Sequence, residues 1–246
     1  MDTTTVATVA LLMGLAAALY STVGHGGASA YLAIMALFSV APDTMRPTAL
    51  ALNLVVAGLG SWRFWRAGQT DLKVLALFAL TAVPAAYIGG GIKVAPEVYR
   101  PLVGGLLWLA ALRLFWQPSA LVAREIRPVP AVVALPIGAG LGLLAGLTGT
   151  GGGIFLSPIL ILMGWADARR TSGIAAGFIL ANSIAGLAGN VASMHALPRE
   201  LPIFAGAVVA GAVVGTWLGT GRLPKPRLLQ GLGLVLVIAG AKLILA

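Results

Sequence analysis

Residues 146–155 read GLTGTGGGIF, and residues 22–31 read TVGHGGASAY. Each glycine cluster lies inside a stretch without charged residues, Pro128–Ala166 for the first and Thr3–Pro42 for the second. Each stretch is about 40 residues long, whereas one helical crossing of a bilayer needs about 20 apolar residues. We therefore expect two membrane segments in each stretch, with the glycine cluster at the break between them.

A break of this kind exposes backbone N–H groups inside the membrane. Such groups are costly there unless they line a cavity or meet a ligand. Two breaks at corresponding positions of two halves are typical of the binding site of a secondary transporter. The sequence therefore predicts a transporter site where the two clusters meet.

The composition of this 246-residue chain is that of a membrane protein. It is 59% hydrophobic and 9% charged, whereas roughly 25% of residues are charged in soluble domains. We predict an all-α integral membrane protein with one membrane domain, residues 1–246. Basic residues beside membrane segments explain the net charge of +9 better than nucleic-acid binding does. The chain has no cysteine, and no metal or cofactor is expected.

Neither glycine cluster matches a catalytic or nucleotide-binding motif. No Gly-Lys-Ser/Thr follows either one, and the dinucleotide pattern would need a glycine in place of Ile154. Ser29 and His25 are close in sequence but do not stand in the Gly-x-Ser-Gly turn of rhomboid-type intramembrane proteases. We therefore do not expect an enzyme.

The apolar segments form two series of five, and matching residues recur in them in the same order. The segments are residues 5–23, 28–41, 47–65, 74–92 and 99–117, then 130–148, 154–165, 171–195, 201–221 and 227–246. The matches pair Thr22, Gly26, Gly27 and Arg46 with Thr148, Gly152, Gly153 and Arg170. This is an internal repeat, and an odd number of segments makes its second copy enter the membrane from the opposite side.

The predicted fold is therefore two inverted-topology repeats of about five helical segments each. Repeat one spans 5–117, a linker spans 118–129, and repeat two spans 130–246. The first two segments of each repeat form a glycine-broken helical hairpin, and the two hairpins are expected to meet near the bilayer midplane.

The positions of the basic residues predict the orientation. With five segments per repeat, one face receives 11 of the 16 basic residues and the other keeps Arg46, Lys93, Arg100, Arg199 and Lys242. The richer face is expected to be cytoplasmic. The prediction is a multi-pass protein of a bacterial-type inner membrane with both termini outside.

The helices that begin near Ala28 and Ile154 are expected to bind an anion. A helix that starts inside the membrane presents N–H groups without partners and the positive end of its dipole. The predicted substrate-binding residues are Thr22, Gly24, His25, Gly26, Gly27, Thr148, Thr150, Gly151, Gly152 and Gly153. Close helix packing is the alternative reading of the glycines.

His25 is the only side chain well inside either charge-free stretch that titrates near neutral pH. It is expected to donate a hydrogen bond to an anion or to carry a coupled proton, because ionisable residues inside a membrane are usually functional. Its counterpart in the second repeat is Gly151, which weakens this reading.

Five residues form a second tier of candidates. Asn53 and Asn182 lie inside apolar segments, where they either bond neighbouring helices or face the substrate. Ser29 offers a hydroxyl beside the first break. Arg46 and Arg170 each follow an aspartate by three residues, so they either anchor segment ends at the membrane edge or attract anions to a vestibule.

The second half resembles the TauE/SafE family of membrane transporters. The resemblance rests on Thr148–Gly153, Pro158, Asp167–Ser172, Asn182, Ser183 and Gly186, and the first half repeats it with Gly24–Gly27, Arg46–Thr48 and Asn53. It covers almost the whole chain and implies an exporter of sulfite or an organosulfonate. His25 departs from the small or hydroxyl residue expected at its position.

The predicted function is a secondary transporter that exports a small sulfur-containing oxyanion by alternating access. A passive anion channel and a membrane scaffold subunit are the alternatives. The expected partners are a small anionic substrate, with a coupled proton as an option, and the lipid bilayer, but no nucleic acid. A homodimer is compatible with the sequence and does not follow from it.

Overall fold

The apolar sequence folds into helices that the glycine and proline breaks separate. The computed structural model describes residues 2–115, 126–221 and 226–245, and these contain ten α-helices and one short 3₁₀ helix. The helices are α1 Thr3–Ser21, α2 Ala28–Leu37, α3 Pro42–Arg66, α4 Leu72–Gly91, α5 Pro96–Phe115, α6 Ala131–Thr148, α7 Gly153–Leu162, α8 Ala168–Gly189, η1 Val191–Ala196, α9 Leu201–Gly221 and α10 Pro226–Leu245.

Helix ends follow local capping chemistry. The Asp2 side chain accepts hydrogen bonds from the backbone N–H and the hydroxyl of Thr5 at the start of α1, and these bonds lower the pKa of Asp2. Asp71 and Asp167 cap α4 and α8 in the same way. α3 begins at Pro42, ahead of the expected start at residue 47, because proline is well tolerated at the first helical position.

The all-α membrane class is confirmed. In the part of the chain that the structure describes, five helices, α1, α4, α6, α8 and α9, are long and apolar enough to cross a bilayer. α2 and α7 have ten residues each, which is too short for an upright crossing. The predicted segment 171–195 is wrong at its end, because α8 stops at Gly189 and η1 follows.

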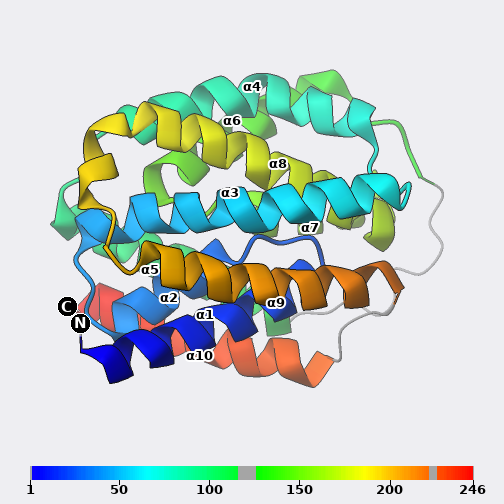
Figure 1. Ribbon diagram of the computed structural model, residues 1–246. Coiled ribbons are helices and arrows are strands. Elements are labelled where there is room, and N and C mark those ends of the chain that lie inside the picture. The colour runs from blue at the N-terminus through cyan, green and yellow to red at the C-terminus, as the bar shows by residue number, and fades with distance from the viewer. Residues whose placement is uncertain (1, 116–125, 222–225, 246) are drawn as a thin grey trace.

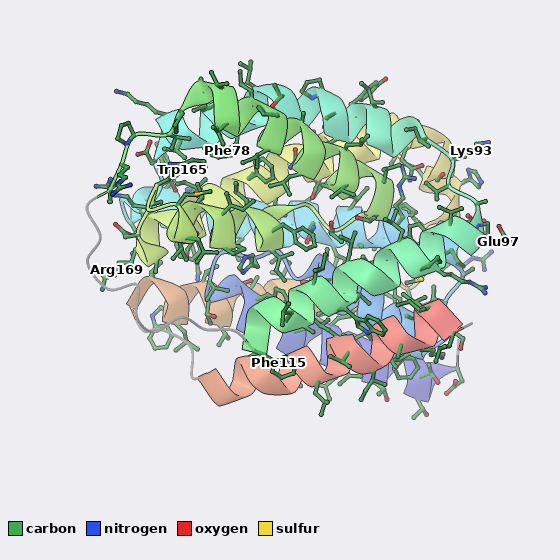
Figure 2. The ribbon with its side chains drawn as sticks, turned by 180° about the vertical axis from the view of Figure 1, so that it is seen from behind. Phe78, Lys93, Glu97, Phe115, Trp165 and Arg169 are labelled. Carbon is green, nitrogen blue, oxygen red and sulfur yellow. The ribbon has the colours of Figure 1, made fainter. Side chains whose placement is uncertain are left out.

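The long helices run side by side along one direction (Figure 1). α1 begins and α10 ends at one end of this bundle, where α3 and α5 also begin and α4 ends. Figure 2 shows Lys93 and Glu97 at this end and Arg169 at the opposite end. We call them the Lys93 end and the Arg169 end.

Among the described residues, five helix pairs make the main packing contacts: α4 with α6, α1 with α9, α5 with α10, α4 with α8, and α3 with α8. Small residues allow the first two pairs to approach closely. A Cβ atom at Gly142 of α6 would collide with the backbone of Ala82 in α4, and one at Gly215 of α9 would collide with the backbone of Ala18 in α1. Close helix packing through small residues is characteristic of membrane bundles.

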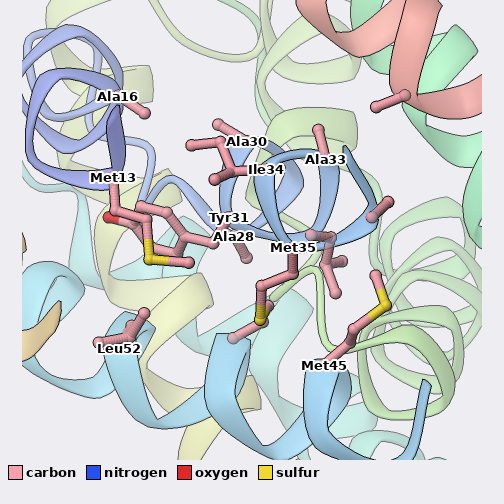
Figure 3. Packing of buried hydrophobic residues seen from close by; sticks show 14 of the residues in the cluster. Met13, Ala16, Ala28, Ala30, Tyr31, Ala33, Ile34, Met35, Met45 and Leu52 are labelled. Carbon is pink, nitrogen blue, oxygen red and sulfur yellow. The ribbon is translucent and has the colours of Figure 1, made fainter. Parts of the chain in front are cut away.

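The helix α2 lies inside the molecule. Every residue from Ala28 to Ala36 is buried, and Figure 3 shows Tyr31 and Met35 packed among side chains of α1 and α3. A helix that is apolar on all sides belongs in a core.

The outer surface of the bundle is apolar. Leu15, Leu80, Leu109, Val132 and Trp217 are each more than half exposed. Exposed apolar side chains on this scale suit contact with lipid rather than with water.

Most of the predicted linker 118–129 lies outside the described part of the chain, which omits residues 116–125. Three of the basic residues used to predict the orientation also lie outside it, namely Arg124, Arg222 and Lys225.

Candidate functional site

Each glycine cluster forms the connection between two helices. α1 ends at Ser21 and α2 begins at Ala28, while α6 ends at Thr148 and α7 begins at Gly153. Gly24 and Gly27 in the first connection, and Gly149, Gly151 and Gly152 in the second, have positive φ. Residues with a Cβ atom rarely adopt this conformation, so the sharp turns depend on glycine.

Glycine also provides the N-caps of α2 and α7. Gly27 and Gly152 occupy these positions, and neither helix start has a side-chain capping hydrogen bond. The first N–H groups of a helix have no intrahelical partner, and they carry the positive end of the helix dipole. The two short helices therefore present uncapped N-termini.

The two connections approach each other at Asn53 of α3. A Cβ atom at Gly26 would meet the Oδ1 of Asn53, and a Cβ atom at Gly151 would lie 2.8 Å from its Nδ2. Both hypothetical Cβ atoms would also contact the Cγ2 of Ile179 in α8, at 3.1 Å and 2.8 Å. One glycine from each cluster thus flanks the same amide.

The amide of Asn53 is completely buried, with 0% of the residue exposed. Within the described residues neither its Oδ1 nor its Nδ2 has a hydrogen-bond partner. Leaving a buried polar group unsatisfied costs about 1–3 kcal/mol. A ligand that bonds this amide would remove that cost.

Asn182 of α8 adds a second buried amide. It is also 0% exposed, and its Nδ2 donates to the carbonyl oxygen of Gly151 at 3.4 Å. Its Oδ1 has no partner among the described residues. Both asparagines thus contact the second glycine cluster, and both retain an acceptor.

His25 joins the first connection to α7. Its Nε2 lies 3.0 Å from the Oγ of Ser157, and that hydroxyl donates to the carbonyl oxygen of Gly153 at 3.0 Å. A serine hydroxyl has a single hydrogen, so in this arrangement the Nε2 of His25 is the donor. The imidazole is buried, and its ring stands edge-on to Tyr20.

The threonine hydroxyl groups near the breaks are already engaged. Thr22 and Thr148 donate to the carbonyl oxygens of Leu19 and Leu144, each at 2.6 Å. The hydroxyl of Thr150 lies 3.1 Å from that of Thr148, which can only accept because its hydrogen is used. These threonines shape the connections, and free donors must come from elsewhere.

The serine of the second tier is engaged as well, because the Oγ of Ser29 donates to the hydroxyl of Tyr20 at 2.9 Å.

Two tyrosines hold the connections in place, and the sequence did not single them out. The hydroxyl of Tyr31 donates to the carbonyl oxygen of Gly26 at 2.7 Å, and that of Tyr99 donates to the carbonyl oxygen of Thr148 at 3.1 Å. Tyrosine is rare here, with four in the chain, and a buried tyrosine needs a partner for its hydroxyl. That signal was available in the sequence.

The two arginines of the second tier have different surroundings. Arg46 is 7% exposed, and it donates to the carbonyl oxygens of Gly89, Gly90 and Ile92 at the end of α4. The side chain of Arg170 is half exposed, and its Nε lies 3.7 Å from Asp167. Arg46 therefore caps a helix inside the protein, whereas Arg170 makes an exposed ion pair.

Among the described residues, no three His, Cys, Asp or Glu side chains are grouped so that they could hold a metal ion.

Comparisons with known proteins agree over nearly the whole chain. A family model described as "Sulfite exporter TauE/SafE" matches residues 9–243. The chain is 38% identical over 228 residues to the probable membrane transporter protein y4hK of Sinorhizobium fredii, and the match covers 92% of each chain. It is 26% identical over 255 residues to the probable membrane transporter protein YjnA of Bacillus subtilis, covering 95% of this chain and 98% of that one. No solved structure matches the chain.

A helical bundle with an apolar outer surface, related along its length to membrane transporters, is itself a membrane transporter. The chain belongs to the TauE/SafE family of sulfite exporters. The resemblance carried by Thr148–Gly153 and its counterpart Gly24–Gly27 is thereby confirmed. The family is one of transporters and not an enzyme class.

Proposed function

We propose that this protein is a secondary transporter that exports a small sulfur-containing oxyanion, sulfite or an organosulfonate, by alternating access. The substrate would bind where the two glycine connections meet. The observation that carries the proposal is the buried, unpartnered amide of Asn53 between Gly26 and Gly151. The uncapped N-termini of α2 and α7 support a negatively charged ligand.

The packing of the helices supports two inverted repeats. If α1–α5 correspond to α6–α10 in order, α4 of the first repeat matches α9 of the second, and α1 matches α6. The contact between α4 and α6 therefore has a matching contact between α9 and α1, and both contacts are present. α3 packs on its own counterpart α8, and α5 on its own counterpart α10. Matching contacts between the two repeats are expected when a pseudo-two-fold axis relates them. One glycine-broken hairpin would then lie on each side of that axis.

The amides at the proposed site also favour a particular kind of ligand. Asn53 offers the NH2 group as a donor and the carbonyl oxygen as an acceptor, and the Oδ1 of Asn182 adds a second acceptor. An oxyanion without hydrogen could use the donor only. A ligand that combines anionic oxygen with an O–H or N–H group, such as hydrogensulfite, would satisfy both sides of the Asn53 amide.

The outward direction follows from the membrane potential. An inside-negative potential drives an anion out with about 2.3 kcal/mol per charge per 100 mV, and no coupling ion is needed. His25, linked to Ser157, is the group that would carry a proton if transport is coupled to one. The relatives y4hK and YjnA come from bacteria, which supports a bacterial inner membrane.

The direct test is efflux from liposomes that contain only the purified protein. Liposomes loaded with sulfite, sulfate, thiosulfate or a small sulfonate should lose sulfite or the sulfonate faster than sulfate, with a rate that saturates. A rate that rises linearly with voltage and concentration would favour the channel. Absence of flux for every anion would favour the scaffold and overturn the proposal.

A further inference from the structure

A pocket with a volume of about 260 Å³ opens at the Lys93 end of the bundle, and its lining does not include Gly26, Asn53 or Gly151. It lies where α3 begins, α4 ends and η1 follows α8. Its lining includes Asp43, Arg46, Lys93, Tyr99, Asn190 and His195. The proposed function assigns no role to this pocket.

The charges in the pocket favour an anion. Arg46 and Lys93 are cationic, and Asp43 is the one carboxylate among the described residues that line the pocket. Hydrogen bonds to the end of α4 hold the guanidinium of Arg46 in place. A low-dielectric wall with an excess of one sign raises the local concentration of oppositely charged solutes.

Arg46 also supplies a donor that the protein does not use. The residue is 7% exposed, and its buried Nε has no hydrogen-bond partner among the described residues. Asn190 is similarly buried, at 8% exposed. The pocket lining therefore includes a largely buried cation that hydrogen bonds hold in place and a buried amide, which is more than a loose collection of surface charges.

The floor of the pocket is continuous with the second glycine connection. Tyr99 lines the pocket, and its hydroxyl donates to the carbonyl oxygen of Thr148. A Cβ atom at Gly149 would lie 3.0 Å from the carbonyl oxygen of Arg46. Two lining residues of the pocket, Tyr99 and Arg46, thus also contact the second glycine connection.

We propose that this pocket is a second anion site, where the transported oxyanion docks between the solution and the glycine connections. The volume corresponds to roughly nine water molecules at about 30 Å³ each, which leaves room for a short organic group on a sulfonate. The inference rests on the proposed function for the class of its ligand. An anionic lipid headgroup shares the same chemistry and is the competing occupant.

The absence of cysteine makes a direct binding test available. In Ser193→Cys the single thiol lies in the pocket lining, and in Arg169→Cys it lies at the opposite end and provides the control. Labelling by iodoacetamide in zwitterionic liposomes is followed while 2-hydroxyethanesulfonate, the probe anion, is added. The sulfonate should slow labelling at position 193 and leave position 169 unaffected.

The charge requirement is tested by adding Lys93→Gln to the Ser193→Cys chain. The concentration that gives half-protection should rise about tenfold, because a charge that attracts the anion is lost. Lys93→Arg should keep the half-protection concentration at the value of the Ser193→Cys chain. Lys73→Gln, at the Arg169 end, should leave that concentration unchanged. Absence of protection at position 193, or equal protection after Lys93→Gln, would overturn the proposal.

The source of the anion is resolved by repeating the labelling with phosphatidylglycerol in the liposomes. Protection by this lipid and not by the sulfonate would assign the pocket to a headgroup and overturn the docking site. Flux measured in parallel keeps the two proposals apart. A normal flux without protection refutes only the pocket, whereas protection without flux refutes the proposed transport function.

Discussion

His25 and Ser157 are 132 positions apart in the sequence and form a buried hydrogen bond of 3.0 Å. This bond links the first glycine connection to α7, which is the helix that follows the second connection. The meeting of the two halves therefore involves a specific polar contact as well as packing. Several measurable consequences follow from it and from the surrounding glycines.

The His25–Ser157 contact should act as a unit. His25→Ala and Ser157→Ala should each slow transport by about threefold to tenfold, which corresponds to a net hydrogen-bond contribution of about 0.5–1.5 kcal/mol. Because both changes remove the same bond, the double variant should be scarcely slower than the worse single variant. Flux in liposomes measures this, and multiplicative losses would show that the two residues act independently.

Gly26 should tolerate no side chain. In Gly26→Ala the new methyl group would overlap with the Asn53 amide, so transport should fall by about tenfold or more. Gly140→Ala in α6 is the matched control, because its methyl group meets nothing within 4 Å. Expression and membrane insertion should match the wild type in both variants. An active Gly26→Ala protein would show that the amide is not part of the path.

Asn53 should discriminate between ligands with and without a hydrogen-bond donor. Sulfamate and methanesulfonate have the same shape and charge, but only sulfamate carries N–H groups. We expect the wild type to prefer sulfamate by about tenfold, because methanesulfonate leaves the acceptor of the amide unpaired. In Asn53→Leu the preference should disappear. Competition of each anion with labelled sulfite measures the preference in the wild type and in Asn53→Leu. Equal inhibition of the wild type by the two anions would refute the placement of Asn53 in the substrate site.

The glycines between α4 and α6 should determine stability rather than substrate selection. Gly142→Ala forces a methyl group onto the backbone of Ala82. Overpacking of this kind costs about 1–3 kcal/mol, which lowers Tm by roughly 3–10 °C in a chain of this size. Gly206→Ala, whose methyl group is unobstructed, should leave Tm unchanged or slightly higher. Thermal unfolding in detergent provides the comparison.

The orientation can be tested with the same cysteine-free background. Glu97→Cys and Arg169→Cys place single thiols at opposite ends of the bundle (Figure 2). With the termini outside, a membrane-impermeant maleimide applied to intact cells should label position 97 and not position 169. Labelling of position 169 alone would reverse the proposed orientation.

The class of the fold and the two helix starts could be predicted because their causes are local. Charge-free stretches and glycine clusters act within a few residues, so the starts at Ala28 and Gly153 were close to the expected positions. Contacts between distant residues could not be predicted in this way. That Asn53 lies between Gly26 and Gly151 depends on how α3 and α8 pack against both connections.

The two arginines illustrate the same limit. Each follows an aspartate by three residues, so the sequence predicts the same role for Arg46 and Arg170. In the structure Asp167 caps α8 and also pairs with Arg170, whereas the N-cap of α3 is Ala41 and Arg46 reaches the end of α4. A difference in helix capping thus separates two positions that have the same local pattern.

Counterflow exchange tests the central claim most directly. Liposomes with the wild-type protein are loaded with unlabelled sulfite, and a trace of labelled sulfite is added outside. Alternating access at a site containing Asn53 predicts that label accumulates transiently inside the liposomes above its external concentration, and that this overshoot is lost in Asn53→Leu with protein insertion unchanged. Passive equilibration without overshoot in the wild type, or an undiminished overshoot in Asn53→Leu, would contradict the account.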